Sequence, residues 1–150
     1  MASTLRRVNK EKNMNDQTIR DVLTQTQRIA LVGASDRTER ASYGVMKYLL
    51  DQGYDVVPVS PKLAGQQLLG QTVYGTLAEI PGKIDMVDVF RNSEAAWGVA
   101  QEAIAIGAKT LWLQLGVINE QAAVLARDAG LTVIMDRCPK IEIPRLGVTR

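Results

Sequence analysis

Short runs of β-branched and aliphatic residues alternate along the chain with longer stretches in which apolar positions recur every three or four residues. The runs predict buried strands, and the longer stretches predict helices with one apolar face. The predicted strands are residues 28–32, 55–59, 84–90, 110–115 and 131–135, and the predicted helices are residues 16–26, 43–52, 93–106 and 119–129. This alternation predicts a doubly wound α/β fold, with a mostly parallel five-stranded sheet in three layers, α/β/α.

Several element boundaries carry local signals of their own. Asp16 is placed to cap the N-terminus of the first helix, and Gly53 and Gly107 are placed to end the second and third helices. Pro58 lies within the second strand and has no backbone N–H, so this strand is not expected to be hydrogen-bonded along its whole length. Between the second and third strands we expect a loop that contains one helical turn near residues 77–82.

The composition indicates a single globular domain. The chain has 150 residues, of which 46% are hydrophobic and 23% are charged. We expect one domain at residues 16–145, preceded by a disordered leader at 1–15 and followed by a C-terminal tail at 146–150. Cys138 is the only cysteine and there is no histidine, which excludes an internal disulfide, a Ser-His-Asp triad, a phosphohistidine and a zinc site of the usual ligands.

The charge is concentrated at the N-terminus. Residues 1–14 hold four basic side chains and one acidic side chain, which leaves 14 basic and 15 acidic side chains in the rest of the chain. The body of the protein is therefore close to neutral, and we expect no nucleic-acid partner. The sequence has neither an apolar run of membrane-spanning length nor a signal-peptide pattern, so we expect a cytoplasmic protein without a membrane partner.

The loop after the first predicted strand resembles a turn that holds phosphate groups. In doubly wound folds, ligands bind at the carboxyl ends of the strands, where the strand order reverses. This loop is about nine residues long, which exceeds the usual length of such connections, and it runs into the N-terminus of a helix. The candidate ligand-binding residues of this segment are Gly33, Ala34, Ser35, Arg37, Arg40, Ser42 and Tyr43.

The residues after the second strand narrow the class of nucleotide. A site for NAD would normally place an acidic residue here to bind the ribose 2′-hydroxyl. The chain instead has Ser60, Pro61 and Lys62, which suit a phosphate on the ribose. Both the 3′-phosphate of coenzyme A (CoA) and the 2′-phosphate of NADP meet this description.

The remaining strand ends supply further candidates. Phe90 and Arg91 lie at the end of the third strand, and Phe90 either stacks on an adenine ring or closes the core. Gln114 and Gly116 lie at the end of the fourth strand. Cys138 follows the fifth, where a packed, unreactive thiol is the commoner role for a buried cysteine.

Five segments resemble a known family when they are taken together. They are V-G-A-S at 32–35, V-x-P-V-S-P-K at 56–62, V-D-V-F-R at 87–91, G-A-K-T-L-W-L-Q-L-G-V at 107–117 and M-D-R-C-P-K-I-E at 135–142. The pattern resembles the small stand-alone CoA-binding proteins, which are similar to the N-terminal domain of the succinyl-CoA synthetase α subunit. The resemblance implies a Rossmann-like CoA-binding fold. It also implies that the first loop holds the pyrophosphate, that Ser60, Pro61 and Lys62 meet the adenosine and its phosphate, and that the turn at residues 137–139 lies near the thiol arm.

The departures from the synthetase limit the expected activity. The synthetase's phosphorylated histidine lies in a second domain, and this chain has neither that domain nor any histidine. We therefore expect a protein that binds CoA or an acyl-CoA, with no catalytic residues and no metal. The alternatives are an NADP-linked oxidoreductase or a CoA-dependent enzyme that uses Asp136, Glu142 or Cys138, and a protein that binds a partner, not identified by the sequence, in response to CoA.

Overall fold

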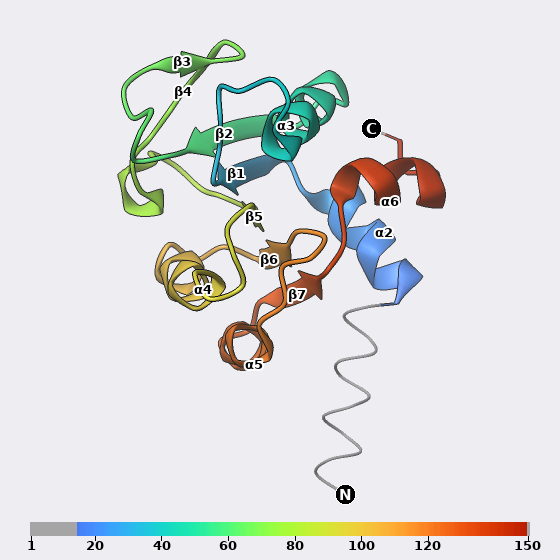
Figure 1. Ribbon diagram of the computed structural model, residues 1–150. Coiled ribbons are helices and arrows are strands. Elements are labelled where there is room, and N and C mark those ends of the chain that lie inside the picture. The colour runs from blue at the N-terminus through green and yellow to red at the C-terminus, as the bar shows by residue number, and fades with distance from the viewer. Residues whose placement is uncertain (1–14, 150) are drawn as a thin grey trace, which may run out of the picture.

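A five-stranded, entirely parallel sheet forms the centre of the molecule. The computed structural model describes residues 15–149. The strands are β1 (Arg28–Val32), β2 (Asp55–Val59), β5 (Met86–Val89), β6 (Thr110–Leu113) and β7 (Thr132–Met135). Their order across the sheet is β2-β1-β5-β6-β7 (Figure 1). This arrangement confirms the predicted fold class, and it is Rossmann-like.

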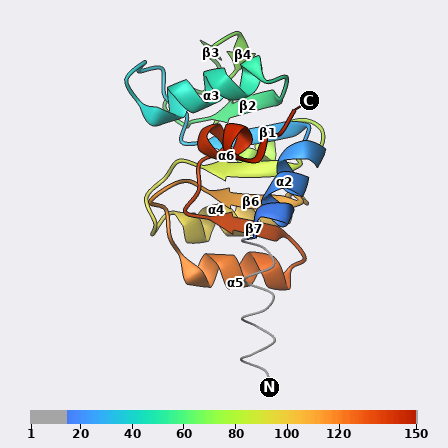
Figure 2. The same cartoon turned by 90° about the vertical axis from the view of Figure 1, so that its right-hand side faces the viewer.

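Helices cover both faces of the sheet because the strands are buried on both sides. The helices are α2 (Asp16–Gln25), α3 (Ala41–Asp51), α4 (Ala96–Ala105), α5 (Glu120–Asp128) and α6 (Pro139–Leu146). Helices α2, α3 and α6 lie on one face, which is turned toward the viewer in Figure 2. Helices α4 and α5 lie on the other face. Alternate strand residues feed the two core clusters, as the pleat of a strand requires.

The observed boundaries differ from the predicted ones at the element ends. The Asn15 side chain, rather than that of Asp16, caps α2 by accepting a hydrogen bond from the Thr18 N–H at 2.8 Å. Asp16 pairs instead with Arg145 at 2.8 Å. Strands β5 and β6 are shorter than predicted, and α4 begins at Ala96 because residues 93–95 form a turn. These differences are local end effects that leave the order of elements unchanged.

Three short elements were not predicted, and a fourth was predicted only as a helical turn. Helix α6 follows β7 where the sequence analysis placed no helix. Strands β3 (Gln67–Leu68) and β4 (Gln71–Thr72) form a small antiparallel hairpin within the predicted loop. The predicted helical turn is the 3₁₀ helix η1 (Leu77–Glu79).

The position of β2 at the edge of the sheet explains why Pro58 is tolerated. Strand β2 pairs with only one other strand of the five-stranded sheet, β1. On its outer side the Tyr74 N–H donates to the Pro58 carbonyl oxygen at 3.1 Å, and the Ser60 N–H donates to the Tyr74 carbonyl oxygen at 2.9 Å. Proline at an edge position therefore costs no hydrogen bond between sheet strands.

The strand order reverses between β1 and β5. The chain passes from β1 outward to β2 and then returns to place β5 on the other side of β1. Loops that follow β1 and β5 therefore diverge and leave a crevice at the carboxyl edge. Among residues 15–149, no helix is long and apolar enough to cross a membrane.

Candidate functional site

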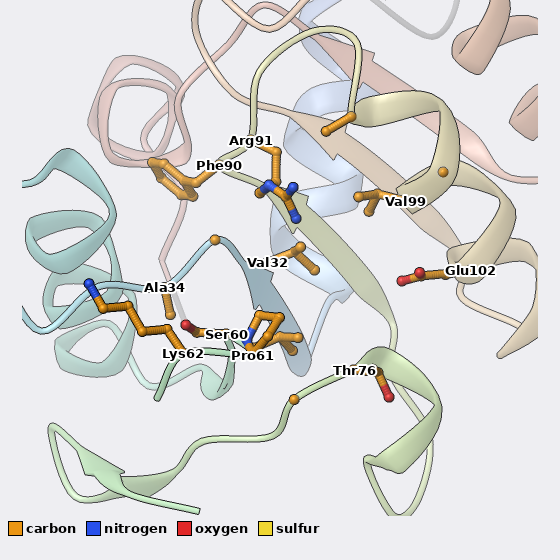
Figure 3. Close-up of a pocket in the computed structure, with 15 residues that line it drawn as sticks. Val32, Ala34, Ser60, Pro61, Lys62, Thr76, Phe90, Arg91, Val99 and Glu102 are labelled. Carbon is orange, nitrogen blue, oxygen red and sulfur yellow. The ribbon is translucent and has the colours of Figure 1, made fainter. Parts of the chain in front are cut away.

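A cavity of about 750 Å³ opens at the carboxyl ends of β1, β2 and β5 (Figure 3). We call it the first cavity. The sequence analysis named seven of its lining residues, which are Gly33, Ala34, Ser60, Pro61, Lys62, Phe90 and Arg91. Figure 3 shows Lys62 toward one end of this cavity and Glu102 toward the other, with Arg91 between them. The strand-end reasoning thus located the crevice correctly, while contact of these residues with a ligand stays a prediction.

Gly33 shapes the start of this cavity. Its φ angle is +95°, and a Cβ atom added there would lie 2.1 Å from the carbonyl oxygen of Phe90. The Gly33 N–H donates to the Val59 carbonyl oxygen at 3.0 Å, and the Ala34 N–H donates to the same oxygen at 3.2 Å. A glycine is therefore required because the first turn packs directly against the ends of β5 and β2.

A second cavity, of about 340 Å³, lies beside the N-terminus of α3. Ser35, Arg37, Arg40, Ser42 and Lys62 line it. The first N–H groups of a helix have no partner within the helix, and the preceding residue, Arg40, makes no side-chain capping bond. The unpaired N–H groups, the hydroxyls and the cations make this cavity a suitable site for an anion.

One of these cations has a partner. Arg37 lies 2.9 Å from Glu39, and both side chains are well exposed. An exposed pair of this kind contributes little to stability, so a bound anion can displace Glu39 at small cost.

A third cavity, of about 310 Å³, lies between α3, α6 and the loop after β6. Its walls are Val45, Leu115, Val117 and Ile141, and Gln114 and Cys138 also line it. The side-chain oxygen of Gln114 is buried and has no hydrogen-bond partner among the described residues. Phe90 lines all three cavities, and Ala41 lines the second and third, so the three lie next to one another.

Other lining residues were missed by the sequence analysis. They are Val32, Val59, Gly75, Thr76, Ala95, Gly98, Val99 and Glu102 in the first cavity, Ala41 in the second and third, and Val45, Leu115, Val117 and Ile141 in the third. Helix α4 and the turn before η1 contribute most of those in the first cavity. Gly98, inside α4, was the available signal, because glycine disfavours a helix interior unless something approaches its backbone.

Two predicted residues lie outside the three cavities. Tyr43 packs partly buried against the core beneath α3. The Gly116 N–H donates to Asp136 Oδ1 at 2.7 Å, which ties the loop after β6 to the end of β7. The structure therefore gives both residues structural contacts, and their contact with a ligand stays a prediction.

The residues considered for catalysis already have structural partners. Glu142 is buried and lies 2.7 Å from Arg145 and 3.5 Å from Arg137. Asp136 holds the Gly116 N–H, and Cys138 is buried where α6 begins. Within residues 15–149, no group of three or more histidine, cysteine or carboxylate side chains is placed to hold a metal ion.

Comparison with known proteins identifies the family. The sequence model of a family described as "CoA binding domain" matches residues 27–144, which include every strand of the central sheet. The chain belongs to the CoA-binding domain family. Its sequence is 42% identical over 130 residues to YneT, an uncharacterized protein of Bacillus subtilis, and the match covers 87% of this chain and 95% of YneT.

Two further proteins are similar to this CoA-binding domain protein. A hypothetical protein from Pyrococcus horikoshii OT3 has a solved structure that is 42% identical, with a TM-score of 0.85 and coverage of 89% of this chain and 92% of that one. The alpha subunit of an ADP-forming acetate–CoA ligase of Pyrococcus furiosus is 27% identical over 128 residues. That match covers 76% of this chain but only 28% of the ligase subunit. The CoA-binding domain protein therefore spans only about a quarter of the length of that ligase subunit.

Proposed function

We propose that this protein binds CoA or an acyl-CoA thioester along the carboxyl edge of its sheet and catalyses no reaction of its own. The observation that carries the proposal is the set of three neighbouring cavities that share Phe90 as a lining residue. The first cavity is lined by both polar and apolar residues, the second by cations and hydroxyls, and the third by apolar residues. This order matches the order of the adenosine, the diphosphate and the thiol end in CoA. Family membership supports the same ligand class.

The parts of CoA are assigned to the cavities by their chemistry. The adenosine suits the first cavity, where Val32 and Val99 offer apolar surface and Glu102 offers an acceptor for an amine or hydroxyl. The diphosphate suits the second cavity, at the N-terminus of α3. Lys62 lines both cavities, and we assign its ammonium group to the 3′-phosphate.

The absence of catalysis is supported by the partners of the candidate groups. Glu142 and Asp136 hold neighbouring structure together, and Cys138 is buried at the base of the third cavity. A general base or nucleophile must reach a substrate with its reactive atom. The carboxylate of Glu142 instead pairs with Arg145 of α6, and that of Asp136 accepts a hydrogen bond from the loop after β6.

The replacement Lys62→Ala tests the nucleotide assignment. We expect it to raise the Kd for CoA about tenfold, which corresponds to about 1.5 kcal/mol, because one charge-assisted hydrogen bond from an exposed lysine is lost. The Kd for dephospho-CoA, which lacks the 3′-phosphate, should stay nearly unchanged. Isothermal titration of the purified chain with both ligands measures the two constants.

The control variant is Lys47→Ala, because Lys47 is exposed on α3 and lies outside the three cavities. It should bind CoA as the unaltered chain does. Equal losses for CoA and dephospho-CoA in Lys62→Ala would contradict the assignment of Lys62 to the 3′-phosphate. Tighter binding of NADP than of CoA by the unaltered chain would contradict the proposed ligand class.

A further inference from the structure

The third cavity distinguishes itself from the other two by its lack of charge. No lysine, arginine, aspartate or glutamate lines it, whereas arginine or lysine lines each of the other cavities. Its volume, about 310 Å³, is at the lower end of the range for small-molecule sites. A carboxylate placed there would lose its water without gaining a counter-charge, which is strongly unfavourable. The cavity therefore suits a small, uncharged, apolar group.

A buried polar atom inside this cavity lacks a partner. Gln114 is only 6% exposed, and its side-chain oxygen has no hydrogen bond among the described residues. Buried amide groups are nearly always hydrogen-bonded, so an unpartnered one indicates a missing ligand group. The unpartnered oxygen is an acceptor, and it can therefore bind an amide N–H. The pantetheine arm of CoA carries such an N–H near its thiol end.

The mouth of the cavity is also apolar. Leu115 is 61% exposed and Ile141 is 52% exposed, and both line the cavity. Binding of an apolar group that covers exposed aliphatic side chains at a cavity mouth is favourable, because it removes apolar surface from water. Phe90 also lines the two cavities assigned to the nucleotide, so the third cavity lies beside them.

From these observations we infer that the third cavity holds the acyl group of a CoA thioester, and that the preferred ligands carry short, apolar, uncharged acyl groups. Carboxylated acyl groups such as succinyl are rejected because the cavity holds no cation to pair with them. Gln114 binds the amide N–H near the thiol end of the pantetheine arm. The inference rests on the proposed function and adds the identity of the acyl group to it.

The test is isothermal titration of the full chain with CoA, butyryl-CoA and succinyl-CoA. Each methylene that is fully buried should tighten binding about fourfold. Butyryl-CoA should therefore bind about tenfold or more tightly than CoA, and succinyl-CoA should bind no more tightly than CoA. Equal affinities for butyryl-CoA and succinyl-CoA would overturn the inference while leaving CoA binding intact. Absence of CoA binding would instead overturn the proposed function.

The variant Leu115→Lys places a cation at the mouth of the cavity. Leu115 is exposed, so the folded state should tolerate the change. We expect the advantage of butyryl-CoA over CoA to fall about tenfold and succinyl-CoA to bind more tightly than before. The matched control is Val124→Lys, which adds the same charge at an exposed aliphatic position on α5. A Leu115→Lys variant that retains the full preference for butyryl-CoA would overturn the inference.

A second variant tests Gln114 separately. Gln114→Leu should weaken the binding of both CoA and butyryl-CoA. The binding of adenosine 3′,5′-bisphosphate, which lacks the pantetheine arm, should stay unchanged. If binding of the bisphosphate were weakened equally, the substitution would act through the fold of the site and not through the pantetheine arm. That result would overturn the role assigned to Gln114.

Discussion

At the scale of single residues, the first turn depends on the absence of a side chain at Gly33. From the sequence, this glycine was a candidate ligand-binding residue in a loop that resembles a phosphate-holding turn. The structure shows that the space beside it is filled by the backbone of Phe90. The turn therefore imposes a packing requirement on this position whether or not a ligand is bound. Only the fold could reveal this, since Phe90 lies 57 residues further along the chain.

Gly33→Ala should destabilise the protein by about 3 kcal/mol. The added Cβ atom meets the Phe90 carbonyl oxygen at 2.1 Å, and the φ angle of +95° is unfavourable for alanine. Denaturant unfolding followed by circular dichroism measures the loss. Gly53→Ala is the matched control, because its φ angle is +94° but nothing lies within 4 Å of the added atom. The backbone cost alone should be about 1 kcal/mol. Equal losses in the two variants would contradict the steric explanation.

At the scale of secondary-structure elements, α6 is fixed to the molecule by a small group of charges. Glu142 is 2% exposed and accepts hydrogen bonds from Arg145, which also bonds to Asp16 at the start of α2. Arg137, in the turn before α6, lies 3.5 Å from the same carboxylate. Helices α2 and α6, at opposite ends of the described chain, are thus joined above one face of the sheet (Figure 2).

Replacement of Glu142 tests how much this group contributes. Glu142→Ala should lower the free energy of unfolding by about 2 kcal/mol, because two guanidinium groups lose a buried acceptor but remain able to reach water. Thermal and denaturant unfolding both report the change. Glu142→Gln keeps the shape and should recover part of the loss. An alanine variant as stable as the unaltered chain would show that apolar packing alone holds α6.

The elements were predictable from sequence to different degrees. The long periodic segments and the bounds of β1 and β2 were predicted correctly, because burial on two faces leaves a strong pattern. Helix α6 was missed because Pro139 and Pro144 suppress helix propensity. Pro139 is nevertheless acceptable in the first turn, where no N–H is needed. The β3–β4 hairpin has only two residues in each strand, which is too short for a period of two to be detected.

The candidate site was predictable only where it follows the strands. Residues just after β1, β2 and β5 could be named because parallel topology brings those ends together. Thr76 and Glu102 reach the first cavity from the turn before η1 and from the middle of α4, and no sequence pattern marks that approach. Whether the named residues contact CoA remains a prediction for the titrations described above.

At the scale of the whole molecule, one carboxyl group links folding stability to pH. Asp88 lies in the central strand β5, opposite Leu31 and Trp112 in the two neighbouring strands. It is fully buried, and neither of its carboxyl oxygens has a hydrogen-bond partner among the described residues. Burial therefore raises the pKa of Asp88 well above its usual value. The folded chain retains this proton to a higher pH than the unfolded chain does.

The stability of the protein should therefore decrease as pH rises. The contribution of Asp88 is complete below the pKa of an unfolded aspartate, about 3.9, and is lost as pH rises through the higher folded pKa. The slope is at most about 1.4 kcal/mol per pH unit. Asp16 acts in the opposite direction, because its hydrogen bond with Arg145 lowers its pKa, and that contribution is lost only as pH falls below about 4.

Urea unfolding between pH 5 and pH 8 isolates the effect of Asp88. The unaltered chain should lose stability across this range, and Asp88→Asn should remove most of the slope because the amide does not titrate. Asp51→Asn, at the exposed end of α3, is the control and should keep the slope of the unaltered chain. The same slope in Asp88→Asn would show that other groups cause the pH dependence.

The division of the cavities between strand ends has a consequence for how such a protein diversifies. The first two cavities are built after β1, β2 and β5 and from α4, whereas Gln114, Leu115, Val117, Cys138 and Ile141 of the third come after β6 and β7. Substitutions after β6 and β7 therefore reshape one end of the crevice and leave the other end untouched. Descendants of one ancestral gene can therefore keep the same nucleotide-binding cavities and diverge in the acyl group that they prefer. Exchange of these two segments between homologues is the corresponding route for engineering.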